Sequence, residues 1–89
     1  MEFQIQISRE CLKKLDKLPE KDRNKIFEKI YLIPDKSENL DIKKLQGYEI
    51  LFRLRVGKYR VVYEFYNNLL LINVIEIDHR KDVYKRISK

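Results

Sequence analysis

Cysteine, histidine and tryptophan are almost absent from this sequence, which has one cysteine, one histidine and no tryptophan among 89 residues. An intramolecular disulfide is therefore impossible, and the Cys/His sets that hold structural zinc cannot be assembled. We expect no metal and no cofactor. Charged residues interrupt every apolar stretch before it is long enough to span a membrane, and no secretory signal is visible at the N-terminus. We therefore expect a cytoplasmic protein with no membrane partner.

Negative charge is scarce in two segments of a chain whose net charge is +6. Residues 43–60 contain six Lys or Arg against one Glu, and residues 79–89 contain five against one Asp. Scattered charge usually indicates only a solvated surface. Charge concentrated on two segments that a short β-meander brings together favours a site for a polyanion, with nucleic acid as the first candidate.

Residues 48–56 and 59–66 both alternate between apolar and polar side chains, which is the period-two pattern of a strand. Gly57 and Lys58 lie between them and form the turn of a predicted hairpin. One face of the hairpin is apolar and belongs to the core. The opposite face is cationic and carries Arg53, Arg55 and Arg60.

A third strand is predicted over residues 69–77, which are apolar at nearly every position. Asn67 and Asn68 precede it and predict a two-residue turn, because asparagine tolerates the positive φ that such a turn needs. A continuous apolar run indicates burial on both faces, so we expect this strand to be central in the sheet. His79 and Arg80 follow at its exit.

The first part of the chain reads as one strand and two helices. Residues 3–7 alternate as a half-buried strand does, and Ser8 can cap the helix that follows. Cys11 belongs to the apolar face of that helix and is interpreted as a small buried residue rather than a nucleophile. Pro19 is placed to begin a second helix and Pro34 to end it.

Residues 35–46 read as a polar loop, and Asp78 can cap a short C-terminal helix. The predicted order of elements is therefore β-α-α-β-β-β-α. We predict an α+β fold in which a helical hairpin packs on a largely antiparallel four-stranded sheet, with the short helix at the C-terminus. One domain over residues 1–89 accommodates all of these elements.

Four segments of the chain, taken in order, resemble the RelE/ParE toxin superfamily of toxin–antitoxin systems, and RelE-like toxins more closely. They are LKKLDKLPE, KKLQGYE, FRLRVGKYRVVYE and IEIDHRKDVYKR. Each piece alone is unspecific, but the ordered set of LxG, RxRxGxYRVVY and HRxxVY is specific. The similarity covers nearly the whole chain, so it implies a single RelE-like toxin domain over residues 1–89.

The resemblance implies a ribosome-dependent endoribonuclease, an mRNA interferase that inhibits translation. RelE-like toxins enter the ribosomal A site and cut messenger RNA by attack of the ribose 2′-hydroxyl. The products are a 2′,3′-cyclic phosphate and a 5′-hydroxyl. The partners implied are the ribosome with mRNA in its A site and a cognate, RelB-like antitoxin.

The resemblance assigns roles to site residues at the positions where this sequence matches the family motif. The resemblance implies that Arg60 stabilises the phosphate under attack and that Arg80 stabilises the leaving group or phosphate. It implies that Tyr84 stacks on or orients the target nucleotide, and that Arg53 and Arg55 form the basic pair of the preceding strand. The predicted catalytic residues are Arg53, Arg60, Arg80 and Tyr84, and the predicted RNA contacts are Arg55, Lys58, His79, Lys81, Lys85 and Arg86.

The general base stays open, because Leu51 stands where RelE has a lysine proposed to help with deprotonation. An arginine cannot readily act as a base, since its pKa lies above about 12. Lys58, His79 and Tyr84 are the candidates. The ordinary pKa of histidine, about 6.5, suits the task. We nevertheless rank Tyr84 above His79, because the family motif supports Tyr84 by position.

The plain alternative for the three hairpin arginines is a solvent-facing sheet kept soluble by cations. Like charges about 5 Å apart on adjacent strands cost stability unless an anion is present, which favours a functional patch. Two other functions stay open. One is a ParE-like inhibitor of DNA gyrase, and the other is a catalytically degenerate, partner-binding member of the same fold.

Overall fold

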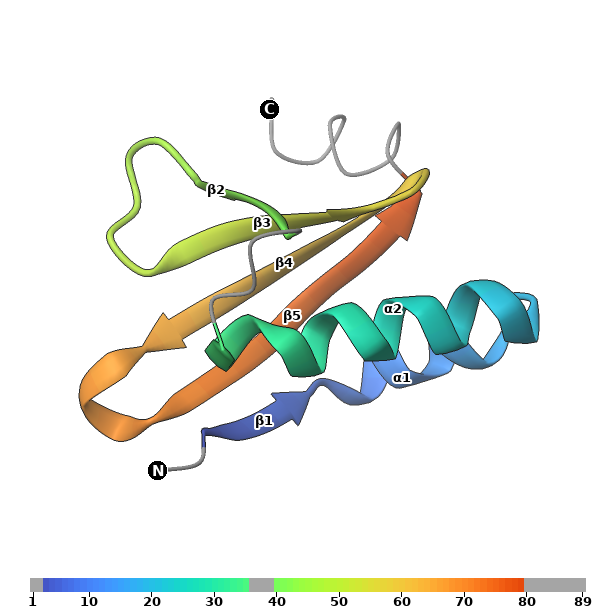
Figure 1. The fold of residues 1–89 in the computed structure, drawn as a ribbon, viewed down its shortest axis with the longest axis horizontal. Helices are drawn as coiled ribbons and strands as arrows, with labels where there is room; N and C mark the ends of the chain where they lie inside the picture. The colour runs from blue at the N-terminus through green and yellow to red at the C-terminus, as the bar shows by residue number, and fades with distance from the viewer. Residues whose placement is uncertain (1–2, 36–39, 80–89) are drawn as a thin grey trace.

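In the described part of the chain, five strands form one sheet in the order β1-β5-β4-β3-β2, and two helices cover one of its faces (Figure 1). The structure is a computed structural model and describes residues 3–35 and 40–79. The helices are α1 (Arg9–Asp16) and α2 (Glu20–Leu32), followed by the short 3-10 segment η1 (Ile33–Asp35). The strands are β1 (Gln4–Ile7), β2 (Asp41–Lys44), β3 (Leu51–Val56), β4 (Tyr59–Tyr66) and β5 (Leu71–His79), with the 3-10 segment η2 (Asn67–Leu69) before β5.

The predicted meander is present, and its register fixes which side chains share a face. Strands β3, β4 and β5 pair antiparallel, while β1, from the start of the chain, lies parallel to β5. Leu54 pairs with Val61, and Val61 pairs with Ile77. All three side chains are at most 1% exposed, so this row lies on the core face.

Among the described strands, the one covered on both faces is β4. The prediction that the third strand of the meander, β5, is buried on both faces is wrong, although β5 does lie inside the sheet, between β1 and β4. Five consecutive residues of β4, from 59 to 63, are buried. In β5, a register shift next to Val62 and Tyr63 leaves Ile75 opposite no residue of β4 and 38% exposed. This bulge lets both Val74 and Ile77 face the core despite their odd spacing. An apolar run that contains a bulge looks continuous in sequence although one of its residues is at the surface.

The sheet has five strands rather than the four predicted, because residues 41–44 form the edge strand β2 within the predicted polar loop. Its sequence, DIKK, has a single apolar residue, Ile42, which pairs with Leu54 of β3. Four residues with one inward apolar side chain are too few to show the period-two alternation by which a strand is recognised in a sequence. Pairing with β3 supplies the strand character that the local sequence lacks.

The turn between β4 and β5 is longer than the two residues predicted. Asn67 lies in the 3-10 segment η2, and the residue with positive φ is Leu70, at 51°. By contrast, Gly57 forms the predicted tight turn between β3 and β4 with a φ of 58°. A glycine adopts this left-handed conformation without steric cost.

The helices fill the core side of the sheet through a few fully buried residues. Helix α1 packs on β5 and α2 packs on β3. Ser8 caps α1 as predicted, since its Oγ accepts a hydrogen bond of 3.2 Å from the Cys11 backbone N–H. Cys11 is 1% exposed, and burial raises the pKa of its thiol, so the prediction of a packing role is confirmed. Leu15, Ile26 and Ile30 are fully buried beside it.

The predicted C-terminal helix lies outside the described residues. Within residues 3–35 and 40–79, no helix is both long and apolar enough to cross a bilayer.

Candidate functional site

Two rows of side chains cross the face of the sheet that lies away from the helices. Strand register places both rows, because side chains of paired residues point to the same face. The first row is Asp41, Arg55, Arg60 and Asp78, from β2 to β5. The second row is Lys43, Arg53, Val62 and Glu76. The three predicted arginines therefore lie together, and carboxylates flank them at both ends of the first row.

The arginines of this face are largely buried despite their charge. Arg60 is 5% exposed, and the side chain of Arg53 is 12% exposed. Arg55 lies directly opposite Arg60. The buried Nε atoms of Arg53 and Arg55 have no hydrogen-bond partner among the described residues. A buried N–H donor left unbonded costs about 1–3 kcal/mol.

Asp41 supplies one anion to the arginines from the edge strand. Its Oδ1 accepts a hydrogen bond of 2.9 Å from Arg53 Nη2, and its Oδ2 lies 3.8 Å from Arg55 Nε. The second distance marks an ion pair without a hydrogen bond. Asp41 was not among the predicted site residues, because only the pairing of β2 with β3 brings it beside the arginines.

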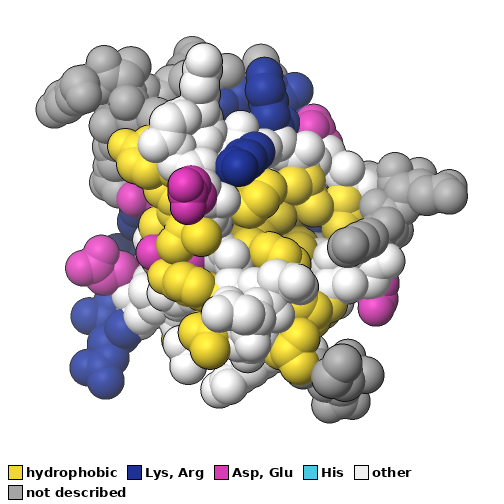
Figure 2. Space-filling model, turned by 90° about the vertical axis from the view of Figure 1, so that its left-hand side faces the viewer, with side chains coloured by type: hydrophobic (Ala, Val, Ile, Leu, Met, Phe, Trp, Pro, Cys, Tyr) yellow, Lys and Arg dark blue, Asp and Glu magenta, His cyan; other side chains and the backbone are white. Residues whose placement is uncertain are grey.

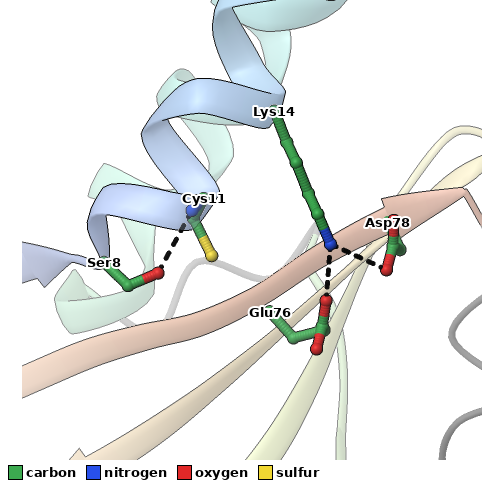
Figure 3. A network of polar contacts seen from close by, with 5 residues as sticks. All are labelled: Ser8, Cys11, Lys14, Glu76 and Asp78. Atoms are coloured by element: carbon green, nitrogen blue, oxygen red, sulfur yellow. Dashed lines mark hydrogen bonds and ion pairs between the residues drawn. The ribbon is translucent and has the colours of Figure 1, made fainter.

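At the β5 end of the two rows, Lys14 of α1 contacts one carboxylate from each row, Asp78 from the first and Glu76 from the second (Figure 3). Its Nζ lies 2.9 Å from Glu76 Oε1 and 3.0 Å from Asp78 Oδ2. Burial alone would lower the pKa of Lys14, but the hydrogen bonds to Glu76 and Asp78 outweigh it and raise that pKa. The contact ties α1 to the strand that flanks Arg60. It was not predicted either, since the partners are more than 60 residues apart in sequence.

His79 and Lys58 lie away from the arginine face. His79 pairs with Tyr59, and their ring centroids are 6.0 Å apart in an edge contact. Tyr59 donates a hydrogen bond of 2.9 Å to Asp22 of α2, which places this pair on the helix side of the sheet. Lys58, in the β3–β4 turn, has its Nζ 5.8 Å from the centroid of the Tyr59 ring. The structure therefore brings Arg53, Arg55 and Arg60 together and separates His79 from them.

The remaining predicted site residues lie outside the described residues, and their roles stay predictions. They are Arg80, Lys81, Tyr84, Lys85 and Arg86.

A second surface feature is an apolar cavity of about 540 Å³ between η1 and the core face of β2, β3 and β4. Figure 2 views the molecule from this end and shows hydrophobic side chains gathered at the surface. Ile42 of the edge strand is part of the lining. The other lining residues are Phe3, Ile33, Pro34, Leu40, Phe52, Tyr63, Phe65 and Asn67.

Comparison with known proteins places this architecture in a family. Residues 5–84 match the family model described as the ParE toxin of a type II toxin–antitoxin system, parDE. The chain belongs to the RelE/ParE toxin superfamily. RelE1 of Methanocaldococcus jannaschii is 34% identical over 88 residues, which are 96% of this chain and 98% of RelE1. The chain is thus a RelE-like toxin of the type II toxin–antitoxin class.

Solved structures of RelE proteins with RelB share the fold. The RelE–RelB complex of Pyrococcus horikoshii OT3 contains a chain with a TM-score of 0.78 and 27% identity, over 90% of this chain and 97% of that one. The RelB–RelE complex of Methanococcus jannaschii contains one with a TM-score of 0.74 and 30% identity, over 91% of this chain and 96% of that one. The resemblance expected from the four sequence segments is therefore confirmed.

Proposed function

We propose that this RelE-like toxin is a ribosome-dependent endoribonuclease that cuts messenger RNA in the ribosomal A site. In the proposed reaction a ribose 2′-hydroxyl attacks the adjacent phosphate, leaving a 2′,3′-cyclic phosphate upstream and a 5′-hydroxyl downstream. The observation that carries the proposal is the group of three arginines on one sheet face, with two buried Nε donors that lack an acceptor among the described residues.

Arginine suits the charge that such a reaction develops. The pentacoordinate phosphorane gains negative charge on its oxygens, and a guanidinium forks onto two of them while staying charged. We assign this task to Arg60, which lies in the middle strand, with Arg53 as a second catalytic contact. Arg55 would bind a neighbouring phosphate, together with Arg53. The proposal keeps Arg80 and Tyr84 as catalytic residues, with Tyr84 against the target nucleotide.

The need for the ribosome follows from what arginines cannot do. An arginine is already protonated at neutral pH, so it cannot act as a general base. His79, which could, faces the helix side of the sheet with Tyr59. The domain alone would therefore stabilise charge but would not hold a flexible RNA in line. Alignment supplied by the A site can be worth about 7–11 kcal/mol in favourable cases.

A RelB-like antitoxin is the second proposed partner. The complexes of Pyrococcus horikoshii and Methanococcus jannaschii join a RelE chain to RelB, which supports such a pairing here. The apolar cavity beside Ile42 would take apolar side chains of the antitoxin, and the exposed Lys43 and Lys44 of the same strand would attract its carboxylates. Both partnerships would operate in the cytoplasm.

Induction of the gene in cells, followed by mapping of new 5′ ends on messages, tests the proposal. We expect growth to stop and new 5′-hydroxyl ends to gather within translated regions. Co-expression of the small protein encoded next to the toxin should restore growth. Growth arrest with intact messages would contradict the proposal.

Inhibition of DNA gyrase is the second candidate function, because the matching family model is described as ParE. A supercoiling assay with purified gyrase separates the two. Inhibited supercoiling together with uncut messages would establish that the protein is a gyrase inhibitor. Failure of both assays, with the antitoxin still bound, would leave a degenerate, partner-binding member of the fold.

A further inference from the structure

Asp41 is placed between two arginines but is itself open to water. Its side chain is 52% exposed, whereas the side chains of Arg53 and Arg55 are 12% and 34% exposed. One carboxylate oxygen is hydrogen-bonded to Arg53, and the other approaches Arg55 at 3.8 Å without reaching hydrogen-bond distance. A single exposed anion thus spans two partly buried cations.

The contacts of Asp41 leave donors unused. Arg53 bonds Asp41 through Nη2 alone, while its Nε and the Nε of Arg55 are buried without an acceptor in the described part of the chain. A phosphodiester carries one negative charge on two non-bridging oxygens, much as a carboxylate does, but a phosphate of RNA is not tethered to β2 as the Asp41 carboxylate is. A phosphate that takes the place of the Asp41 carboxylate can therefore settle where it accepts hydrogen bonds from donors that Asp41 does not reach.

We propose that Asp41 is an internal competitor for a phosphate subsite formed by Arg53 and Arg55. In the free protein its carboxylate occupies the subsite and neutralises part of the charge of the two arginines. A backbone phosphate of the RNA displaces it into water when the RNA binds. The inference rests on the proposed RNA cleavage and adds to it a residue that sets the affinity of the arginine face.

Two observations separate this role from a structural one. An ion pair whose partner is half exposed contributes little to stability, about 0–1 kcal/mol, so Asp41 is easily displaced. The edge strand is held instead by its ladder with β3 and by Ile42, which lies opposite the fully buried Leu54. Loss of the Asp41 charge therefore leaves β2 paired.

The test compares Asp41→Asn with Asp16→Asn. Both variants lose one negative charge, but Asp16 is an exposed residue of α1, on the helix side of the sheet. The probe is a short single-stranded RNA with 2′-O-methyl riboses, which binds but cannot be cut by a 2′-hydroxyl. Its Kd is measured by fluorescence anisotropy over a series of salt concentrations, with thermal unfolding as the check on folding.

We expect Asp41→Asn to lower the Kd about three- to fivefold, the size expected when one exposed ion pair no longer competes. Asp16→Asn should change it little at about 0.15 M salt, because charges beyond the Debye length of about 8 Å are screened. Asp41→Glu, which keeps the charge, should return the Kd toward the wild-type value. In the wild-type protein, the carboxylate ¹³C resonance of Asp41, and not that of Asp16, should shift as RNA is added.

Weaker binding by a folded Asp41→Asn variant would overturn the proposal, since Asp41 would then position Arg53 for RNA instead of competing with it. Equal changes of the Kd in the two Asn variants would also overturn it. So would an Asp41 carboxylate resonance that does not shift when RNA is added. Arg53→Ala keeps this failure distinct from failure of the proposed function. If Arg53→Ala leaves both RNA binding and cleavage intact, the arginine face is not the RNA site at all.

Discussion

Replacing Arg60 with methionine removes the charge proposed to stabilise the reacting phosphate while keeping most of the buried stem. Arg60 is 5% exposed, so truncation to alanine would also uncover the space of its methylene groups. At about 0.8 kcal/mol for each buried CH₂, Arg60→Ala would lose roughly 2 kcal/mol of packing. Arg60→Met avoids most of that loss and isolates the charge.

Two cross-strand electrostatic terms act on Arg60 in opposite directions. Arg55 lies directly opposite and repels it, while Asp78 lies opposite on the other side and attracts it. Each cross-strand pair is worth about 0.2–1 kcal/mol. We therefore expect Arg60→Met to change the free energy of unfolding by less than about 1 kcal/mol. The cleavage rate on programmed ribosomes should fall about 10²–10³-fold, the loss typical of one donor to a transition-state oxyanion.

Urea unfolding and single-turnover cleavage are measured on the same preparations. Arg9→Met is the matched control, because Arg9 is an exposed arginine at the start of α1 and the change in charge is the same. It should cleave as the wild type does. Full activity in Arg60→Met, or an activity loss that only follows unfolding, would refute the role given to Arg60.

Three further predictions concern the frame around the site. Leu15→Ala should lower the free energy of unfolding, measured by urea denaturation, by about 2–5 kcal/mol, because Leu15 is fully buried. Leu12→Ala should lower it by much less, because Leu12 is 43% exposed, and equal losses would contradict the packing of α1. The raised pKa of Lys14 means that its ion pairs stabilise the folded state below pH 10.5 and that this contribution is lost as the pH rises through the folded-state pKa. The stability difference between wild type and Lys14→Met should therefore be constant near neutral pH and shrink above pH 10.5, and a difference unchanged to high pH would exclude the ion pairs as its source. Burial raises the pKa of Tyr63 to about 12, so ultraviolet titration should show a last tyrosine ionising near that pH, absent in Tyr63→Phe.

The alternating hairpin was the most predictable part of the fold. Period-two alternation over two adjacent strands determines both the core face and the arginine face, so the sequence alone groups Arg53, Arg55 and Arg60. The capping role of Ser8 and the burial of Cys11 were likewise local properties, readable from helical spacing.

Features that depend on pairing partners could not be predicted in this way. Strand β2 has one inward residue and becomes a strand only beside β3. The bulge at Ile75 depends on how β5 meets β4, and it changes which side chains face the core beyond it. Asp41 and Lys14 act on the arginine face only through those pairings, and charged residues in a loop or on a helix carry no sequence signal for such a role.

The proposed dependence on the ribosome is tested most directly by cleavage of one message in two conditions. Purified toxin is added to the message either free or programmed on ribosomes with an empty A site, and the ends of the products are determined. We predict rapid cleavage only on ribosomes, with a 2′,3′-cyclic phosphate upstream and a 5′-hydroxyl downstream, and weak, salt-sensitive binding to the free message. Equal cleavage rates with and without ribosomes would contradict the account.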